Sequence, residues 1–471
     1  MFSFRVLLAL GLVAVYVLTI ANRFNDPDLW FHLKLGEIMW NTHRIPTADL
    51  FSHTAYGHPW TAHEWLAQIT IYAAYRLGGY SGLMGWFTIF GSALLVLVYA
   101  VGYRQAGNEL GAFLVAILAF FCGTIGLAIR PQLMGYAFLA AELLLLDRAA
   151  RNRRFLWAIP PLFAIWVNCH GSYFFGIGVL AVHWICSFVK GKWGFIAAEG
   201  GSAGERRQLG WTLAVSVLAL FANPVGWRLV LYPLDLMFHQ STNLSAVAEW
   251  APPDLRDGRT LAMLAAIMGI PVACVLLRAE LKLRELLLVV AVSWLAVRHI
   301  RMMFVFGIVV SPVLCRLLGS ELRRSSDREH PVVNALLILA MAAVSIRAFP
   351  AAGDIQSQIA KSNPVAAVRY IRLAGIRGPM LNEYVFGGYL IWALPEEKVF
   401  VDGRTDVFDW TGVLAEYGRW ATLSEDPQIL LDKYGIRLCL LTKDSPMVRV
   451  MGYLPNWRKA YRDEVAVVFV R

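Results

Sequence analysis

Eleven apolar segments, most of them long enough to cross a bilayer as a helix, constrain the fold of this chain more than any other feature. The first covers residues 4–22. The others cover residues 81–103, 109–128, 132–149, 155–169, 171–189, 209–222, 260–277, 284–298, 301–318 and 331–347. Hydrophobic residues make up 58% of the 471 and charged residues 16%, an apolar surplus that no single water-soluble core can bury. The sequence therefore predicts an all-α multi-pass membrane bundle and excludes an ordinary soluble enzyme or a disordered chain.

Lysine and arginine positions predict how the bundle is oriented. Residues 1–349 contain 28 Lys and Arg against 19 Asp and Glu, whereas residues 350–471 contain 15 and 14. With the N-terminus inside, 17 of the 28 basic residues lie in inner loops, as the positive-inside rule requires. Segment 4–22 is predicted to be an uncleaved helix, because it starts with Arg5 alone and no small-residue cleavage pattern follows. We expect a cytoplasmic N-terminus, an extracytoplasmic C-terminus and no nucleic-acid partner.

The sequence divides into two predicted domains. Residues 1–349 form a transmembrane domain whose first outer loop, residues 23–80, is long and rich in aromatic residues. Helices are expected at residues 29–41 and 63–77, the second lying in the membrane interface. Residues 350–471 are predicted to form a small soluble α/β domain outside the membrane, with strands at 398–402, 437–441 and 465–470.

Polar and ionisable residues gather at the predicted outer ends of the spans, whereas the inner ends carry mainly plain Lys and Arg. The outer set consists of Asp26, Asp28, His32, His63, Glu64, Arg130, Gln132, Asn168, His170, Asn223, Glu249, Arg298, His299 and Arg301. Ionisable groups near membrane depth are costly and commonly mark a site, so we expect a polar cavity that faces outward. The alternative for each single residue is an ordinary contact with lipid headgroups.

Asp28 is the sharpest candidate in this set. If a helix begins after Pro27, Asp28 and His32 lie four residues apart on one helical face. An aspartate beside a histidine is able to act as a general base or to bind a metal. The alternative is that Asp28 only caps the helix.

The residues around Asp28 resemble those of known enzymes. Residues 28–34, Asp-Leu-Trp-Phe-His-Leu-Lys, resemble the first-loop motif of oligosaccharyltransferase catalytic subunits. Gly57-His-Pro59 and Ala62-His-Glu-Trp65 are similar to motifs of the protein-mannosyltransferase and lipid A aminoarabinose transferase group. All belong to the GT-C superfamily of membrane glycosyltransferases. The resemblance implies a GT-C-like bundle with two interfacial helices in its first outer loop and a sugar donor linked to polyprenyl phosphate.

The C-terminal segment carries a second resemblance. Residues 380–391 and 399–405 resemble an oligosaccharyltransferase segment, although its Trp-Trp-Asp motif is absent. Residues 130–132, 168–172 and 402–404 resemble signatures of a bacterial subgroup, which implies the bacterial inner membrane. From the residues alone, two interpretations of this segment are equally good. Either it binds the acceptor, or Gly387-Gly388 serves tight helix packing and Asp402 forms a salt bridge with Arg404 at a turn.

The predicted function is an inverting transfer of sugar from a polyprenyl-phosphate-linked donor to an extracytoplasmic glycan, lipid or protein. The predicted site residues are Asp28, Glu64, His63 and His32 for catalysis; Arg298, Arg301, His299 and Arg130 for the donor phosphate; and Asp402, Arg404 and Tyr384 for the acceptor. The sequence assigns no definite cofactor, and a metal-independent transfer is one interpretation. A divalent cation, Mg²⁺ or Mn²⁺, held by Asp28 and Glu64 is the alternative. The rival functions are a multi-pass transporter or lipid-linked-sugar flippase, and a partner protein without catalysis.

Overall fold

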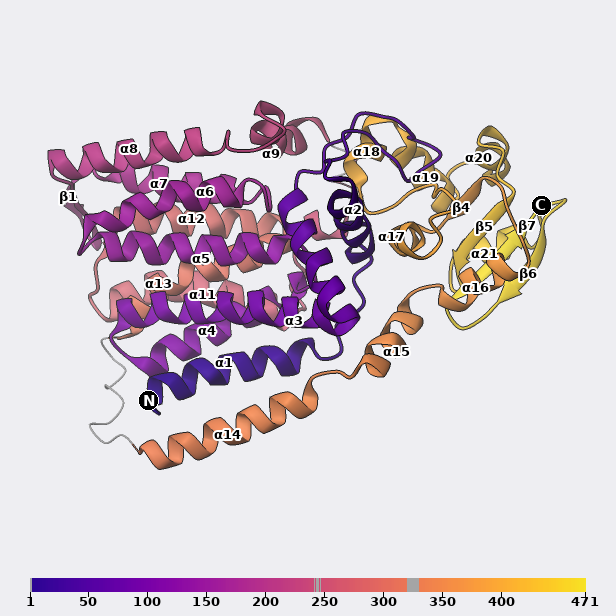
Figure 1. The fold of residues 1–471 in the computed structure, drawn as a ribbon. Coiled ribbons are helices and arrows are strands. Elements are labelled where there is room, and N and C mark those ends of the chain that lie inside the picture. Colours follow the sequence, from indigo (N-terminus) through magenta and orange to yellow (C-terminus); the bar gives the residue numbers. More distant parts are fainter. Residues whose placement is uncertain (1, 241, 243–244, 246, 320–329) are drawn as a thin grey trace. The chain divides into compact units, whose positions relative to one another are not determined.

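A computed structural model describes residues 2–240, 242, 245, 247–319 and 330–471. The chain folds into two compact units (Figure 1). The bundle unit contains Met1–Ala21, Phe87–Pro233 and Ala248–Phe349, and the loop–tail unit contains Asn22–Trp86, Leu234–Val247 and Pro350–Arg471.

Helices make up most of the bundle unit. They include α1 (Phe4–Ile20), α4 (Glu109–Gly123), α5 (Gln132–Ala149), α6 (Ile159–Trp166), α7 (Tyr173–Cys186), α8 (Ala203–Ala219), α11 (Gly258–Leu276), α12 (Leu283–Arg298), α13 (Met303–Gly319) and α14 (Pro331–Ala348), together with parts of two further helices that are shared with the loop–tail unit. Four short 3₁₀ turns join them in the described part: η1 (Thr124–Gly126), η2 (Arg153–Ala158), η3 (Ala248–Trp250) and η4 (Ile300–Met302). A small sheet of β1 (Lys190–Trp193), β2 (Ile196–Glu199) and β3 (Leu281–Lys282) has the order β1-β2-β3.

Helix length and composition agree with a membrane-embedded protein. Among the described residues, five helices are long and apolar enough to cross a membrane: Trp65–Ala106, Glu109–Gly126, Gly258–Leu276, Ile300–Gly319 and Pro331–Ala348. Phe4–Ile20 and Tyr173–Cys186 are shorter apolar helices. The multi-pass helical class is confirmed, and the number of eleven spans stays a prediction.

Small residues let the bundle helices approach closely. A Cβ atom on Gly123 of α4 would lie 2.3 Å from the Phe304 ring of α13, and one on Gly307 would lie 3.0 Å from the Ala119 backbone. Membrane helices gain most of their association energy from such close packing, since lipid tails are as apolar as the side chains. α13 therefore lies at the centre of the bundle unit, and its residues 303–311 are all buried.

Helix α3 (Trp65–Ala106) contains both the interfacial helix and the span that the sequence predicts at 63–77 and 81–103. Gly78 and Gly79 break it, because both leave helical backbone angles and Gly79 has a φ of 58°. A Cβ atom on Gly82 would lie 2.0 Å from the carbonyl oxygen of Ala74. Glycine is required at this bend because any side chain would collide with the preceding turn.

The loop–tail unit is a mixed α/β structure. Its helices include α2 (Leu29–Thr42), α15 (Ala352–Ser362), α16 (Val365–Leu373), α17 (Tyr384–Ala393), α18 (Thr405–Trp410), α19 (Val413–Ala421), α20 (Pro427–Lys433) and α21 (Pro446–Met451). Helix α9 (Trp227–His239) ends in this unit. The strands are β4 (Met380–Asn382), β5 (Leu438–Thr442), β6 (Arg458–Arg462) and β7 (Ala466–Val470), in the order β4-β5-β7-β6. β4 and β5 are parallel, and the other two pairs are antiparallel.

The strand predicted at 398–402 is wrong, whereas those at 437–441 and 465–470 are confirmed as β5 and β7. The 398–402 segment is not a strand of the β4-β5-β7-β6 sheet, and its backbone bonds to the first outer loop and to a side chain of β4. Val399 N–H donates to the Phe51 carbonyl at 3.0 Å, and Phe400 N–H donates to the Asn382 side chain at 2.8 Å. A buried apolar run therefore extends along the first outer loop and not along the sheet, which explains why its pattern resembles that of a strand.

The first outer loop and the C-terminal segment belong to the same compact unit. The prediction from the sequence placed the loop in the transmembrane domain, residues 1–349. Helix α17 packs on α2 through Gly388, where a Cβ atom would lie 2.1 Å from the Pro27 carbonyl oxygen. The Trp30 and Tyr389 rings meet edge to face with centroids 5.1 Å apart. The close-packing interpretation of Gly387-Gly388 is therefore confirmed.

Candidate active site

The start of helix α2 fixes the backbone of Asp28. The Asp26 side chain accepts a hydrogen bond from Asp28 N–H at 2.7 Å, and His32 N–H donates to the Asp28 carbonyl at 3.3 Å. The Asp28 side chain makes no capping hydrogen bond to the helix, so the interpretation of Asp28 as a simple cap is wrong. The Asp28 side chain is half-buried.

The turn after Asp402 lies directly against the Asp28 carboxylate. A Cβ atom on Gly403 would be 1.9 Å from Asp28 Oδ1 and 3.2 Å from the Phe31 ring. No side chain fits at this position without moving Asp28. The Asp-Gly-Arg motif of the C-terminal segment therefore positions the carboxylate through its glycine, a role that the sequence analysis did not assign to Gly403.

The other predicted catalytic residues lie where α2 meets the beginning of α3. His32 is buried, with Nδ1 3.1 Å from Gln68 Nε2 and 3.7 Å from Glu64 Oε2. His63 Nε2 lies 3.9 Å from the same Glu64 oxygen. The helices approach closely at Gly36, where a Cβ atom would meet the Gln68 carbonyl oxygen at 2.3 Å. His32, Glu64 and His63 are thus brought together. Gln68 was missed, although it follows Glu64 by four residues on one helical face.

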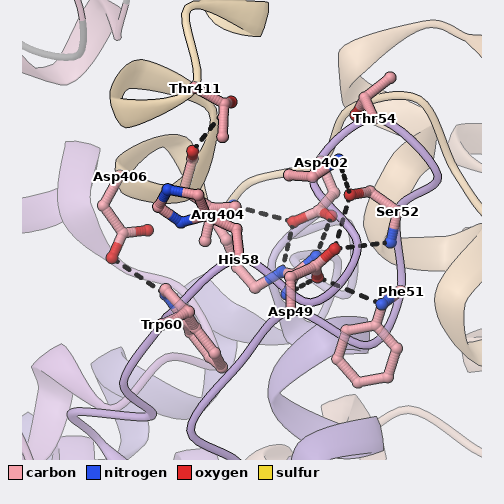
Figure 2. Close-up of polar contacts among 12 residues, drawn as sticks. Asp49, Phe51, Ser52, Thr54, His58, Trp60, Asp402, Arg404, Asp406 and Thr411 are labelled. Carbon is pink, nitrogen blue, oxygen red and sulfur yellow. Dashed lines mark hydrogen bonds and ion pairs between the residues drawn. The ribbon is translucent and has the colours of Figure 1, made fainter.

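Arg404, Asp402 and Asp49 form a buried ion network (Figure 2). Arg404 Nη1 donates to Asp49 at 2.6 Å, Nη2 donates to Asp402 at 2.6 Å, and Nε donates to Asp402 at 2.8 Å. Asp49 also accepts hydrogen bonds from the Ser52 hydroxyl at 2.6 Å and from Phe51 N–H at 3.1 Å. The salt-bridge interpretation of Asp402 and Arg404 is confirmed, and Asp49 was not predicted because it lies 355 residues from Arg404.

Burial and charge act in opposite directions on the Arg404 guanidinium. Burial by itself favours the neutral form, but the two carboxylates outweigh it and raise the pKa of Arg404. The side chain also lies over the Phe51 and Trp60 rings, at 4.8 and 5.2 Å from their centroids. A role for Asp402 and Arg404 in acceptor binding stays a prediction. It would require this network to open, since Arg404 is 3% exposed and Asp402 is fully buried.

Neighbouring contacts fasten the loop to the C-terminal segment. Trp60 Nε1 donates to Asp406 Oδ2 at 3.0 Å (Figure 2). The Thr54 hydroxyl donates to the Phe400 carbonyl at 2.6 Å. His53 Nε2 lies 2.9 Å from the Met380 carbonyl. Burial lowers the pKa of His53, and the charge of Lys398 adds to that effect, although the hydrogen bond to Met380 opposes both. His53 is therefore a neutral donor at pH 7.

The third predicted acceptor residue, Tyr384, opens helix α17. Its backbone N–H donates to the Tyr417 hydroxyl at 2.9 Å, and its side chain is half-buried. Burial raises the pKa of Tyr417, and the nearby Glu383 charge adds to that effect. The predicted role of Tyr384 stays a prediction.

The bundle unit contains a separate cationic cluster around Glu249. Arg130 Nη1 lies 3.0 Å from Glu249 Oε1, and Arg301 Nε lies 4.0 Å from Oε2. Arg301 also donates to Gln132 Oε1 at 3.2 Å and lies over the Trp250 ring at 4.5 Å. Both arginines therefore contact the same carboxylate, at different oxygen atoms. The side chains of Arg130 and Arg301 are partly exposed, at 21% and 20%.

The structure brings three of the four predicted phosphate residues together. His299 Nδ1 is 2.6 Å from the Trp250 carbonyl, which places His299 beside Arg301 and Arg130. Arg298 is exposed at the end of α12 and has no hydrogen bond or ion pair within the described part of the chain. Arg298 is therefore separate from this cluster, because adjacent residues at a helix end point to different sides.

The divalent cation suggested for Asp28 and Glu64 stays a prediction. Among the described residues, no group of three or more His, Cys, Asp or Glu side chains is arranged to hold a metal ion. Such ions bind six or more oxygen ligands, several of them from carboxylates or carbonyls. The steps proposed below use no metal, and the requirement for one stays untested.

Comparison with known proteins shows which fold this is. No protein family model and no curated protein sequence matches the chain. Among solved structures, it is similar to the oligosaccharyltransferase of Archaeoglobus fulgidus tethered to an acceptor peptide, with a TM-score of 0.56 and 13% identity, covering 92% of this chain and 68% of that one. It is also similar to ArnT of Cupriavidus metallidurans bound to undecaprenyl phosphate, with a TM-score of 0.51 and 14% identity, covering 98% and 97%. The chain has the GT-C fold.

The GT-C fold confirms the fold class implied by the motifs around Asp28, and the two interfacial helices stay a prediction. A second structure of the archaeal enzyme, named AglB, contains an inhibitory peptide and a dolichol-phosphate, and has a TM-score of 0.53 at 13% identity over 92% of this chain and 69% of that one. At such identities the likeness establishes the fold, while activity depends on the site residues.

Proposed function

We propose that this chain is an integral-membrane glycosyltransferase that transfers a sugar from a polyprenyl-phosphate-linked donor to an extracytoplasmic glycan, lipid or protein. The observation that carries the proposal is the half-buried Asp28 carboxylate, which is positioned by Gly403 and not used as a helix cap. The lipid phosphates bound to ArnT and AglB support the donor class. We place the protein in the bacterial inner membrane, with the N-terminus cytoplasmic and residues 350–471 outside.

The proposed reaction is a direct displacement. Asp28 accepts the proton of an acceptor hydroxyl while that oxygen forms a bond to the anomeric carbon. The bond between the anomeric carbon and the phosphate oxygen breaks, and its electron pair leaves with polyprenyl phosphate. Because attack is opposite to the leaving group, the anomeric configuration is inverted. His32, Glu64 and His63 orient the acceptor or tune Asp28, and Asp402, Arg404 and Tyr384 belong to the segment that selects it.

The donor phosphate is assigned to the cationic cluster, for which Arg301, Arg130 and His299 are now favoured over Arg298. Arginine binds phosphate oxygens through paired N–H groups, and a net positive charge stabilises the leaving phosphate. Glu249 holds both guanidinium groups in place without cancelling their charge.

Two neighbouring arginines provide a matched test of the phosphate assignment. Arg301→Gln is expected to raise the KM for the lipid-linked donor by about 10- to 100-fold, the value of a charge-assisted hydrogen bond. Arg298→Gln removes the same charge from an exposed position and is expected to change KM by less than about threefold. Equal effects of the two substitutions would contradict the assignment and indicate only a general electrostatic attraction.

Substitution of Gly403 tests whether the Asp-Gly-Arg turn holds Asp28 in the position needed for catalysis. Gly403→Ala is expected to reduce kcat by about tenfold or more, because a displacement of about 1 Å at a reacting group costs up to 100-fold. Gly418→Ala in α19 is the control, since a Cβ atom there meets nothing within 4 Å. Thermal unfolding of both variants should stay near wild type. If Gly403→Ala retains the kcat of Gly418→Ala, the Asp-Gly-Arg turn does not position the base.

Release of free polyprenyl phosphate tests the function itself. Purified protein in lipid nanodiscs is incubated with a panel of lipid-linked sugars and candidate membrane acceptors. A transferase releases the lipid phosphate from at least one donor in an acceptor-dependent manner. A flippase instead moves the intact donor between leaflets, so flipping without release would overturn the proposal in favour of transport.

A further inference from the structure

A cavity of about 500 Å³ lies in the bundle unit at the opposite end of α5 from the cationic cluster. Helix α5 has 18 residues, so the two ends are about 27 Å apart. The cavity is where α5 and α7 end and where α12 begins, the end at which β1 is labelled in Figure 1. Its volume is within the range of small-molecule sites, and no step proposed above uses it.

The cavity lining contains more basic than acidic side chains, and two of the basic side chains have no acidic partner among the described residues. The basic residues are Arg104, Arg151, Arg153, Lys282 and Arg284, and the acidic residues are Asp147, Glu199, Glu205 and Glu285. Each acidic residue is already paired: Asp147 with Arg104, Glu199 with Lys282 at 3.4 Å, Glu205 with Arg153 at 3.7 Å, and Glu285 with Arg316 outside the lining. The positive charge in excess therefore belongs to Arg151 and Arg284.

Arg284 is the important member of this pair. It is half-buried on the first turn of α12 and makes no hydrogen bond or ion pair with any residue that the structure describes. A half-buried guanidinium that lines a cavity and has no acidic partner among the described residues presents its N–H donors to a bound anion, which matches them through paired, charge-assisted hydrogen bonds. Arg151 is exposed at the same cavity, where a second cation strengthens the attraction for a phosphate.

The lining also contains Gln105, His183 and Ser187, and an apolar part of the wall that selects the kind of anion. Leu143, Leu146, Leu156, Leu209, Leu288 and Val309 contribute to the wall. A free phosphate ion gains nothing from such a wall, whereas a lipid buries its chain there at about 0.8 kcal/mol for each CH₂ group. Basic pockets between membrane helices are a known way to hold anionic headgroups.

We propose that this cavity binds the phosphate group of an anionic phospholipid, with Arg284 as its principal ligand. The basic residues at this end were interpreted from the sequence only as determinants of orientation. The structure adds the cavity that these basic residues line. It also shows that the acidic residues of the lining pair with other basic residues, so that Arg284 is available to a ligand. The proposal does not depend on the transferase activity, because the cavity and the predicted catalytic residues share no side chain.

Thermal unfolding of the purified full-length protein in detergent tests this site without any enzyme assay. Phosphatidylglycerol, phosphatidylcholine and inorganic phosphate are titrated separately. We expect phosphatidylglycerol to raise the unfolding midpoint saturably, and the other two to leave it unchanged. An equal rise with phosphatidylcholine would overturn the proposal, since it would show a requirement for lipid without a requirement for charge. An equal rise with inorganic phosphate would overturn the lipid assignment in favour of a free anion.

Matched variants locate the site. Arg284→Gln is expected to weaken the apparent affinity for phosphatidylglycerol by about tenfold or more, as the loss of a charged hydrogen bond predicts. Arg207→Gln is the control, because Arg207 is exposed near the start of α8 and does not line the cavity. If Arg284→Gln fails to fold, Arg151→Gln is used in its place. We expect Arg151→Gln to lower the apparent affinity for phosphatidylglycerol by about fivefold, the contribution of one cation near the membrane surface. Equal affinities in the cavity variant and Arg207→Gln would contradict the assignment.

Discussion

Replacing Asp28 with asparagine is expected to lower the rate of sugar transfer by about 100-fold or more, with the fold unchanged. Asparagine has nearly the same shape as aspartate, so contact with Gly403 is preserved, but the amide cannot accept the proton of an acceptor hydroxyl. The measurement is the initial rate of polyprenyl phosphate release in nanodiscs at saturating donor and acceptor.

The control for this variant lies on the same helix. Glu37→Gln removes a carboxylate that pairs with Lys34 at 2.6 Å and is not among the proposed catalytic residues. We expect the transfer rate of Glu37→Gln to stay within about twofold of wild type, because the loss of a partly exposed ion pair has only a small effect. Asp28→Asn with near-full turnover would show that another group accepts the proton, while leaving the transferase assignment intact if the wild type releases lipid phosphate.

Removing Arg404 is expected to be the most destabilising single change in the loop–tail unit. Arg404→Met leaves Asp49 and Asp402 buried with no cation between them, and breaking a buried pair in this way costs about 3–5 kcal/mol. The loop that carries Asp49 should then detach from the C-terminal segment. The measurements are the thermal unfolding midpoint and the rate of proteolysis within residues 44–62.

Two further variants separate charge from packing at Arg404. Arg372→Gln breaks the exposed pair with Glu396 and is expected to cost less than about 1 kcal/mol. The combined variant Asp49→Asn, Asp402→Asn, Arg404→Met removes both uncompensated carboxylates and should recover part of the lost stability. An unfolding midpoint for Arg404→Met equal to that of Arg372→Gln would refute the structural role of the network.

Sequence rules of short range predicted the local structure around Asp28 well. The helix expected at 29–41 is α2, Leu29–Thr42, because Pro27 and an apolar periodic run define its start within a few residues. Asp426 and Pro427 begin α20 in the same local way, and Asp426 accepts a capping hydrogen bond from Gln428 N–H at 2.9 Å. Such features depend on neighbours in the chain, so the sequence contains all the information that they need.

Contacts between distant segments were not predicted. Asp49 has no local feature that distinguishes it from an exposed loop aspartate, yet it is the second carboxylate of the Arg404 network. Gly403 was known only as part of a motif, and its function appears when Asp28 lies against it. The 398–402 segment has the pattern of a strand but bonds to the first outer loop, because burial produces the same apolar run in either place.

The sequence by itself determined that this protein is a helical membrane protein, with its candidate base at the start of a helix in the first outer loop. Length and periodicity of apolar runs fix those properties, since a bilayer accepts only helices whose backbone groups are satisfied within the segment. Only the tertiary structure decided that Asp28 meets Gly403, that Arg298 lies apart from Arg301 and that Arg284 lines a cavity. Those outcomes depend on which distant side chains pack together, and packing is a property of the whole fold that no local pattern records.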